Sequence, residues 1–109
     1  MVIVNEREQQ MNKQLKEKVI EKAKQLKNVY DCFDIEISKD KTLFVQVEHK
    51  SEFDSKEKEY FIELNEVYYI DNDKCCEPCG NYNERVIFGN LELLASTIDK
   101  YLKYHKINV

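Results

Sequence analysis

The sequence predicts a two-layer α+β domain in which an N-terminal helix, an antiparallel meander of three to five strands and a C-terminal helix follow one another. Apolar residues recur at helical spacing towards both ends of the chain and alternate with polar residues in the middle. The chain has 109 residues, the usual length of one domain, so we expect a single domain over residues 1–109.

The first helix is predicted over residues 7–27, a segment rich in Lys, Glu and Gln. Its apolar residues recur at steps of four, four, four and three and form a narrow stripe: Met11, Leu15, Val19, Ala23 and Leu26. One alternative stays open at this end of the chain. If translation starts at Met11, residues 1–10 form a flexible N-terminal tail.

The strands are predicted where the period changes to two. Residues 33–37 and 43–48 alternate apolar with mostly polar side chains, as half-buried strands do, and residues 38–42 form the turn between them. A third run, residues 60–64, follows a segment predicted to be a charged loop over 50–58. Residues 67–70 either continue this third strand past a bulge or return as a fourth strand.

The longest irregular loop is predicted over residues 71–83, because this segment combines Asp, Asn, Pro, Gly and three cysteines. A short strand over 85–88 follows, and Asn90 is a suitable N-cap for the final helix. That helix has the clearest apolar stripe of the chain: Leu91, Leu94, Ala95, Ile98, Tyr101, Leu102 and His105. Both helices should pack on one face of the sheet and leave the other face to water.

Composition excludes several classes of protein. No apolar run approaches the ~20 residues that cross a bilayer, and no secretory signal is recognisable, so we expect no membrane association, a cytoplasmic location and reduced cysteines. Gly80 and Gly89 are the only glycines, which excludes glycine-rich nucleotide loops. The net charge of −4 disfavours direct nucleic-acid binding, and the lysines of the first helix are interpreted as a solvated face.

The negative charge is concentrated on the predicted sheet. Residues 31–73 hold 13 acidic and 5 basic side chains, whereas residues 1–30 carry a net charge of +3. Alternation directs a set of carboxylates and two phenylalanines to the face that the helices leave free, and these are the candidate partner-binding residues: Asp34, Glu36, Phe44, Glu48, Glu59, Phe61 and Glu63. Like charges on neighbouring strands cost stability, so stability alone does not favour this arrangement.

These residues predict a small non-enzymatic binding or inhibitory protein that docks on a basic surface of a partner protein, such as a nucleic-acid-acting enzyme or a toxin. The competing interpretation is an ordinary solvated face whose charges prevent edge-to-edge aggregation. Pairing of sheet edges into a homodimer stays open. The abundance of Lys, Glu, Asn and Ile is compatible with an accessory protein of a low-GC bacterium or of its mobile elements.

The alternative function is a small zinc-stabilised module built on the cysteine segment. The gap between Cys76 and Cys79 suits a turn that presents two thiolates to one zinc ion, with Cys75 beside them. Further ligands would have to come from Cys32, His49 or His105, none at a diagnostic spacing. No other cofactor and no catalytic residue are predicted, although a cleft formed by distant residues could still hold a small enzyme's site.

Overall fold

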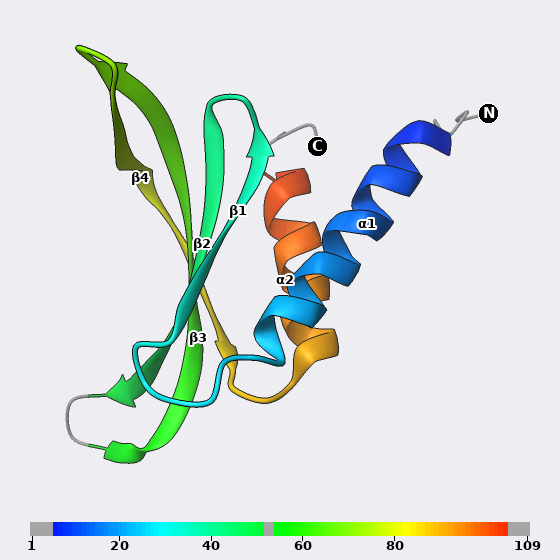
Figure 1. Cartoon of the computed structure of the whole chain (residues 1–109). Helices are drawn as coiled ribbons and strands as arrows, with labels where there is room; N and C mark the ends of the chain where they lie inside the picture. Colours follow the sequence, from blue (N-terminus) through cyan, green and yellow to red (C-terminus); the bar gives the residue numbers. More distant parts are fainter. Residues whose placement is uncertain (1–5, 52–53, 105–109) are drawn as a thin grey trace.

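The computed structural model describes residues 6–51 and 54–104. Its elements follow one another in the order α1 (Glu6–Ala23), β1 (Cys32–Ser38), β2 (Lys41–Ser51), β3 (Asp54–Ile70), β4 (Asp73–Ile87) and α2 (Leu91–Tyr104). The strands form one antiparallel sheet in the order β1-β2-β3-β4, and both helices lie on the same side of it (Figure 1). The predicted α+β fold is confirmed.

The core lies between the helices and the sheet. Every second residue of the central strands points into it, and most of these side chains are almost fully buried: Leu43, Val45, Val47, Tyr60, Ile62 and Leu64. Val19 of α1 and Leu94 and Ile98 of α2 cover them from the helical layer. Burial of side chains of this size contributes roughly 1.5–3 kcal/mol each, so this layer dominates the stability of the fold.

Helix α1 ends at Ala23, one turn before the predicted end. The N–H of Leu26 donates to the carbonyl of Ala23 (3.1 Å), which tightens the chain into a turn. The carboxylate of Asp31 then accepts the N–H groups of Lys27 (2.9 Å) and Asn28 (2.8 Å) and stabilises the bend into β1. At its other end α1 already includes residues 6–10, and residues 1–5 lie outside the described part of the chain.

The predicted charged loop over residues 50–58 is wrong. The ladder between β2 and β3 continues through His49↔Lys58 to Ser51↔Asp54, and residues 52–53 lie outside the described part. Charged side chains do not interrupt a strand when alternate positions face water, which is why composition misled the prediction. Residues 60–64 and 67–70 belong to one long strand, β3. Of the two alternatives, residues 67–70 therefore continue the third strand and do not form a separate fourth strand.

The predicted loop over residues 71–83 is also wrong, because most of it is strand β4. Asp71 and Asn72 have positive φ angles of 50° and 71° and form the two-residue turn that suits a β-hairpin. Pro78 is tolerated because β4 is an edge strand, where a missing N–H need not break the ladder. The irregularity is confined to a bulge between Pro78 and Asn83, where Gly80 adopts a positive φ.

The C-terminal helix agrees closely with the prediction. The side-chain oxygen of Asn90 accepts the N–H of Leu93 at 2.9 Å, the expected N-cap bond. The predicted apolar stripe is buried at five positions, Leu94, Ala95, Ile98, Tyr101 and Leu102, and Leu91 packs partly against the core. His105 lies outside the described residues.

Candidate functional site

The sheet face opposite the helices, here called the open face, is the candidate site. Inward residues of β1 to β3 are buried, and most residues between them are exposed or half-buried, although Thr42 on the open face is buried. All seven candidate partner-binding residues lie on the open face. Asp34 and Glu36 of β1 are exposed, whereas the candidates on β2 and β3 are half-buried by their neighbours: Phe44, Glu48, Glu59, Phe61 and Glu63.

The centre of the open face is a row of three side chains across three strands. Phe44 of β2 is paired with Asp34 of β1 on one side and with Glu63 of β3 on the other. Paired residues of antiparallel strands have Cβ atoms roughly 4.5–5.5 Å apart, so the phenyl ring lies between two carboxylates. The strand order therefore produces an apolar group flanked by negative charge.

Arg85 of β4 pairs with two carboxylates of the open face near Phe61, a contact that the sequence pattern did not predict. Its guanidinium forms ion pairs with Glu48 (3.0 Å) and with Glu59. It also lies over the ring of Phe61, 4.9 Å from the ring centroid. Only the β3–β4 register, in which Phe61 is paired with Arg85, reveals this contact, so no local pattern could have predicted it.

Two of the predicted carboxylates and one predicted anchor are thus occupied within the molecule. The side chain of Glu59 is 14% exposed and that of Glu48 is 29% exposed, and both are engaged by Arg85. Among the described residues, no ion pair joins Asp34, Glu36 or Glu63 to a basic side chain. The charge that is free to meet a partner therefore gathers around Phe44.

The folded protein disfavours the charged form of the Glu63 carboxyl. Burial is the main cause that raises the pKa of its carboxyl, and the neighbouring charge of Glu48 raises it further. A carboxylate in this position is stabilised by an incoming cation, because the cation lowers the cost of the charged form. The electrostatics of the row therefore favour a basic group next to Phe44.

The cysteine segment does not form the predicted metal-binding turn. Glu77 and Pro78 are paired with Glu66 and Asn65, so β4 is extended through this segment and the adjacent Cys75 and Cys76 project to opposite faces. Cys79 packs partly against the core, and burial raises the pKa of its thiol.

The other proposed ligands lie elsewhere in the fold. Cys32 is on the opposite edge strand, His49 is on β2, and His105 lies outside the described residues. In the described ranges no three side chains of His, Cys, Asp or Glu form a group that could hold a metal ion.

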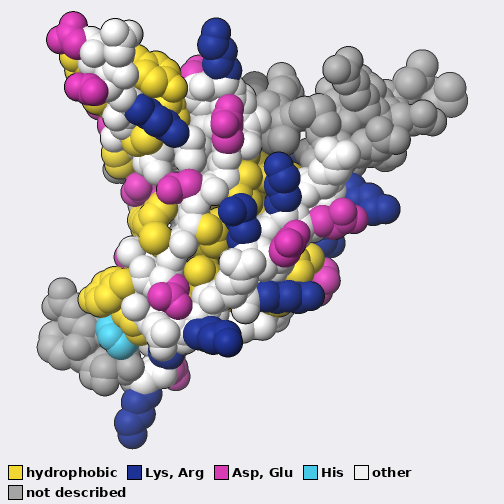
Figure 2. Space-filling view, in the orientation of Figure 1, with side chains coloured by type: hydrophobic (Ala, Val, Ile, Leu, Met, Phe, Trp, Pro, Cys, Tyr) yellow, Lys and Arg dark blue, Asp and Glu magenta, His cyan; other side chains and the backbone are white. Residues whose placement is uncertain are grey.

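A second exposed feature is the hairpin tip, here called the arm (residues 68–75). The β2–β3 ladder ends at Lys41↔Glu66, so the arm consists of β3 and β4 alone. Tyr69 is 65% exposed and Ile70 is 56% exposed, and Figure 2 shows hydrophobic side chains gathered on the arm. The two-residue Asp71-Asn72 turn between β-prone segments was the signal that could have revealed the arm from the sequence.

Comparisons of the chain with protein-family models, curated proteins and solved structures find no match. Within the described residues, no helix is long and apolar enough to cross a membrane.

Proposed function

We propose that this protein is a non-enzymatic binding module that docks its open face on a basic surface of a partner protein. The observation that carries the proposal is the row Asp34–Phe44–Glu63, an aromatic ring between two carboxylates on a face that neither helix covers. Aromatic anchors supply contact area at a protein interface, and surrounding charges select the partner and accelerate association.

Glu36 extends the charge of this row along β1. It is exposed and follows Asp34 by two residues, so both carboxylates project from the same face. Phe44 is the proposed anchor, because Arg85 already lies over Phe61. Basic grooves of nucleic-acid-acting enzymes and basic toxins present the complementary charge, which makes an inhibitory role the preferred form of this function. A cytoplasmic location suits the four free cysteines.

The test is capture of a partner by the tagged chain from nuclease-treated lysate of the source cell, at low and high salt. Wild-type protein should retain one near-stoichiometric basic protein at low salt and lose it at high salt, because exposed charge pairs are screened. The Asp34→Lys/Glu36→Lys variant should lose this protein. Retention of the same partner by the variant contradicts the proposal.

A matched control reverses the same amount of charge elsewhere. Glu17 on α1 and Asp73 on the arm are exposed and distant in the fold from the row around Phe44. The Glu17→Lys/Asp73→Lys variant should keep the partner. If both double variants lose it equally, net charge rather than the open face controls binding.

A further inference from the structure

Strand β1 is an edge strand with a predictable set of free peptide groups. It is bonded to β2 on one side only, and the N–H of Val47 donates to the carbonyl of Asp31 (2.9 Å) in the same register as the β1–β2 ladder. In an antiparallel ladder the residues bonded to the partner strand recur at every second position. The peptide groups of Cys32, Asp34 and Glu36 are therefore directed away from β2, towards the free edge.

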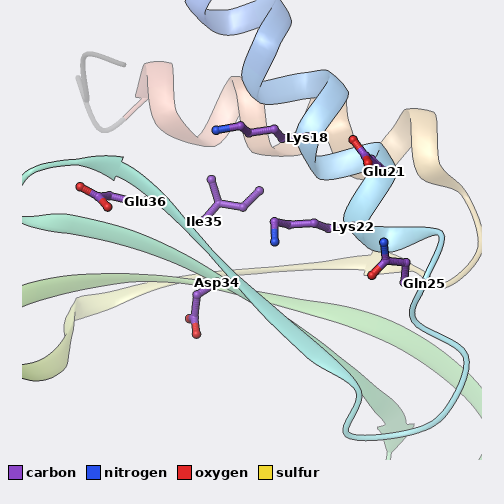
Figure 3. Close-up of a pocket in the computed structure, with 7 residues that line it drawn as sticks. All are labelled: Lys18, Glu21, Lys22, Gln25, Asp34, Ile35 and Glu36. Atoms are coloured by element: carbon purple, nitrogen blue, oxygen red, sulfur yellow. The ribbon is translucent and has the colours of Figure 1, made fainter.

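Helix α1 runs beside this edge without filling the space next to it. A groove of about 340 Å³ separates the two elements, and Figure 3 shows lysines reaching over it from α1 while Ile35 points towards the helix from β1. Its lining residues are Lys18, Glu21, Lys22, Gln25, Asp34, Ile35 and Glu36. No hydrogen bond from the described part of α1 reaches the free edge of β1, so the edge is open to another strand.

The charges on β1 determine which kind of strand fits. If β1 paired antiparallel with β1 of a second copy around Asp34, that carboxylate would meet its own equivalent across the pair. Like charges placed directly opposite each other on neighbouring strands are destabilising. A strand that places basic side chains opposite Asp34 and Glu36 is instead attracted to β1, because each basic side chain lies against a carboxylate.

We infer that an extended, basic segment of the partner adds to the free edge of β1 as an antiparallel fifth strand. This inference rests on the proposed function and specifies how the basic partner is held. The main-chain groups of Cys32, Asp34 and Glu36 supply the hydrogen bonds, and the two carboxylates select the side chains.

The two sides of the added strand meet different surroundings. Alternate side chains that project to the open face lie beside Asp34 and Glu36 and are basic. The intervening side chains point to the groove, where on α1 the two lysines Lys18 and Lys22 outnumber Glu21 and disfavour a second set of basic residues. The recognised sequence therefore alternates basic residues with small polar or acidic ones over about five positions, the span of the free groups from Cys32 to Glu36.

The test uses a peptide of four Lys-Thr repeats as the probe and the full chain labelled with nitrogen-15. The peptide should bind saturably at concentrations up to ~1 mM, and amide exchange at Cys32, Asp34 and Glu36 should slow by at least ~10-fold in the complex. Methylation of the lysine amide nitrogens should abolish binding, because in this register those N–H groups bond to β1. Methylation of the threonine amides should leave binding intact.

Three outcomes overturn the inference: no binding of the probe, binding without protection of the three amides, or equal loss with both methylated peptides. The isosteric variant Asp34→Asn/Glu36→Gln should weaken binding, whereas Asp73→Asn on the arm should not. Binding without protection would leave the docking role of the open face standing, since charge alone then holds the peptide. If the peptide protects the three amides but no basic protein is captured from lysate, the proposed function is contradicted. The edge of β1 then remains a peptide-binding site.

Discussion

Arg85 determines how much of the open face remains for a partner. Its guanidinium contacts Glu48, Glu59 and the ring of Phe61 at once, so one positive charge is shared by two carboxylates and the same side chain covers an apolar group. Removal of the basic partner costs more for half-buried carboxylates than for exposed ones, because the remaining charge is left poorly solvated. The carboxylates beside Phe61 are therefore paired within the molecule, whereas the row around Phe44, the proposed binding surface, has no ion pair among the described residues.

Replacement of Arg85 by glutamine should lower the free energy of unfolding by about 1 kcal/mol, since the guanidinium is itself half-exposed. Urea denaturation measures the effect. In a Glu48→Gln/Glu59→Gln background the same replacement should cost much less, because no carboxylate is left unpaired. An equal cost in both backgrounds would show that the ion pairs contribute nothing.

We expect the ionised carboxylate of Glu63 to lower the free energy of unfolding at pH 7. Its pKa is raised from the ordinary value of 4.5 by burial first and by Glu48 second, so the folded protein binds this proton more tightly than the unfolded chain. The resulting stability is present below pH 4.5 and is lost as the pH rises through the raised pKa. Glu63→Gln should therefore be more stable than wild type at pH 7, with a difference that shrinks in acid. Thermal unfolding at several pH values measures this, and a less stable variant at pH 7 would contradict it.

At the scale of elements, periodicity predicted the two helices and the inner strand faces well, because burial imposes the same period on sequence and structure. It failed where residues of charged or turn-forming type were taken for loops, since residues 50–51, 54–58 and 73–78 belong to strands. The membership of the open face could be predicted from alternation alone. The contacts of Arg85 and the free edge of β1 could not, because both depend on the order and register of strands distant in sequence.

The N-cap of α2 offers a direct check on an element boundary. Asn90→Ala removes the acceptor for the Leu93 N–H and should lower the free energy of unfolding by about 1 kcal/mol, whereas Asn90→Asp should retain the bond. Chemical denaturation of both variants distinguishes them. Equal stability of the alanine variant and wild type would show that another group caps the helix.

The arm should contribute little to folding despite its apolar side chains. Tyr69→Ser should change the free energy of unfolding by no more than about 0.5 kcal/mol, because this side chain is 65% exposed. Ile62→Ala, at a fully buried position of the same strand, should cost about 3 kcal/mol and serves as the reference. A large loss of unfolding free energy in Tyr69→Ser would contradict this, because it would show that the Tyr69 side chain packs against another part of the same chain.

In the whole molecule, the two helices bury one face of the sheet and leave its acidic face and the edge of β1 free. The net charge of −4 arises from the sheet region, whereas residues 1–30 are net basic. This asymmetry gives the molecule an acidic side, and in the proposed function this side orients a basic partner towards the open face before contact.

Amide chemical-shift changes on the labelled protein, measured when the captured partner is added, show whether the open face around Phe44 is the binding surface. The largest changes should fall on Asp34, Phe44 and Glu63, with little change along the outer side of α2. Changes concentrated on the arm, at Tyr69 and Ile70, or on α2 would contradict this assignment.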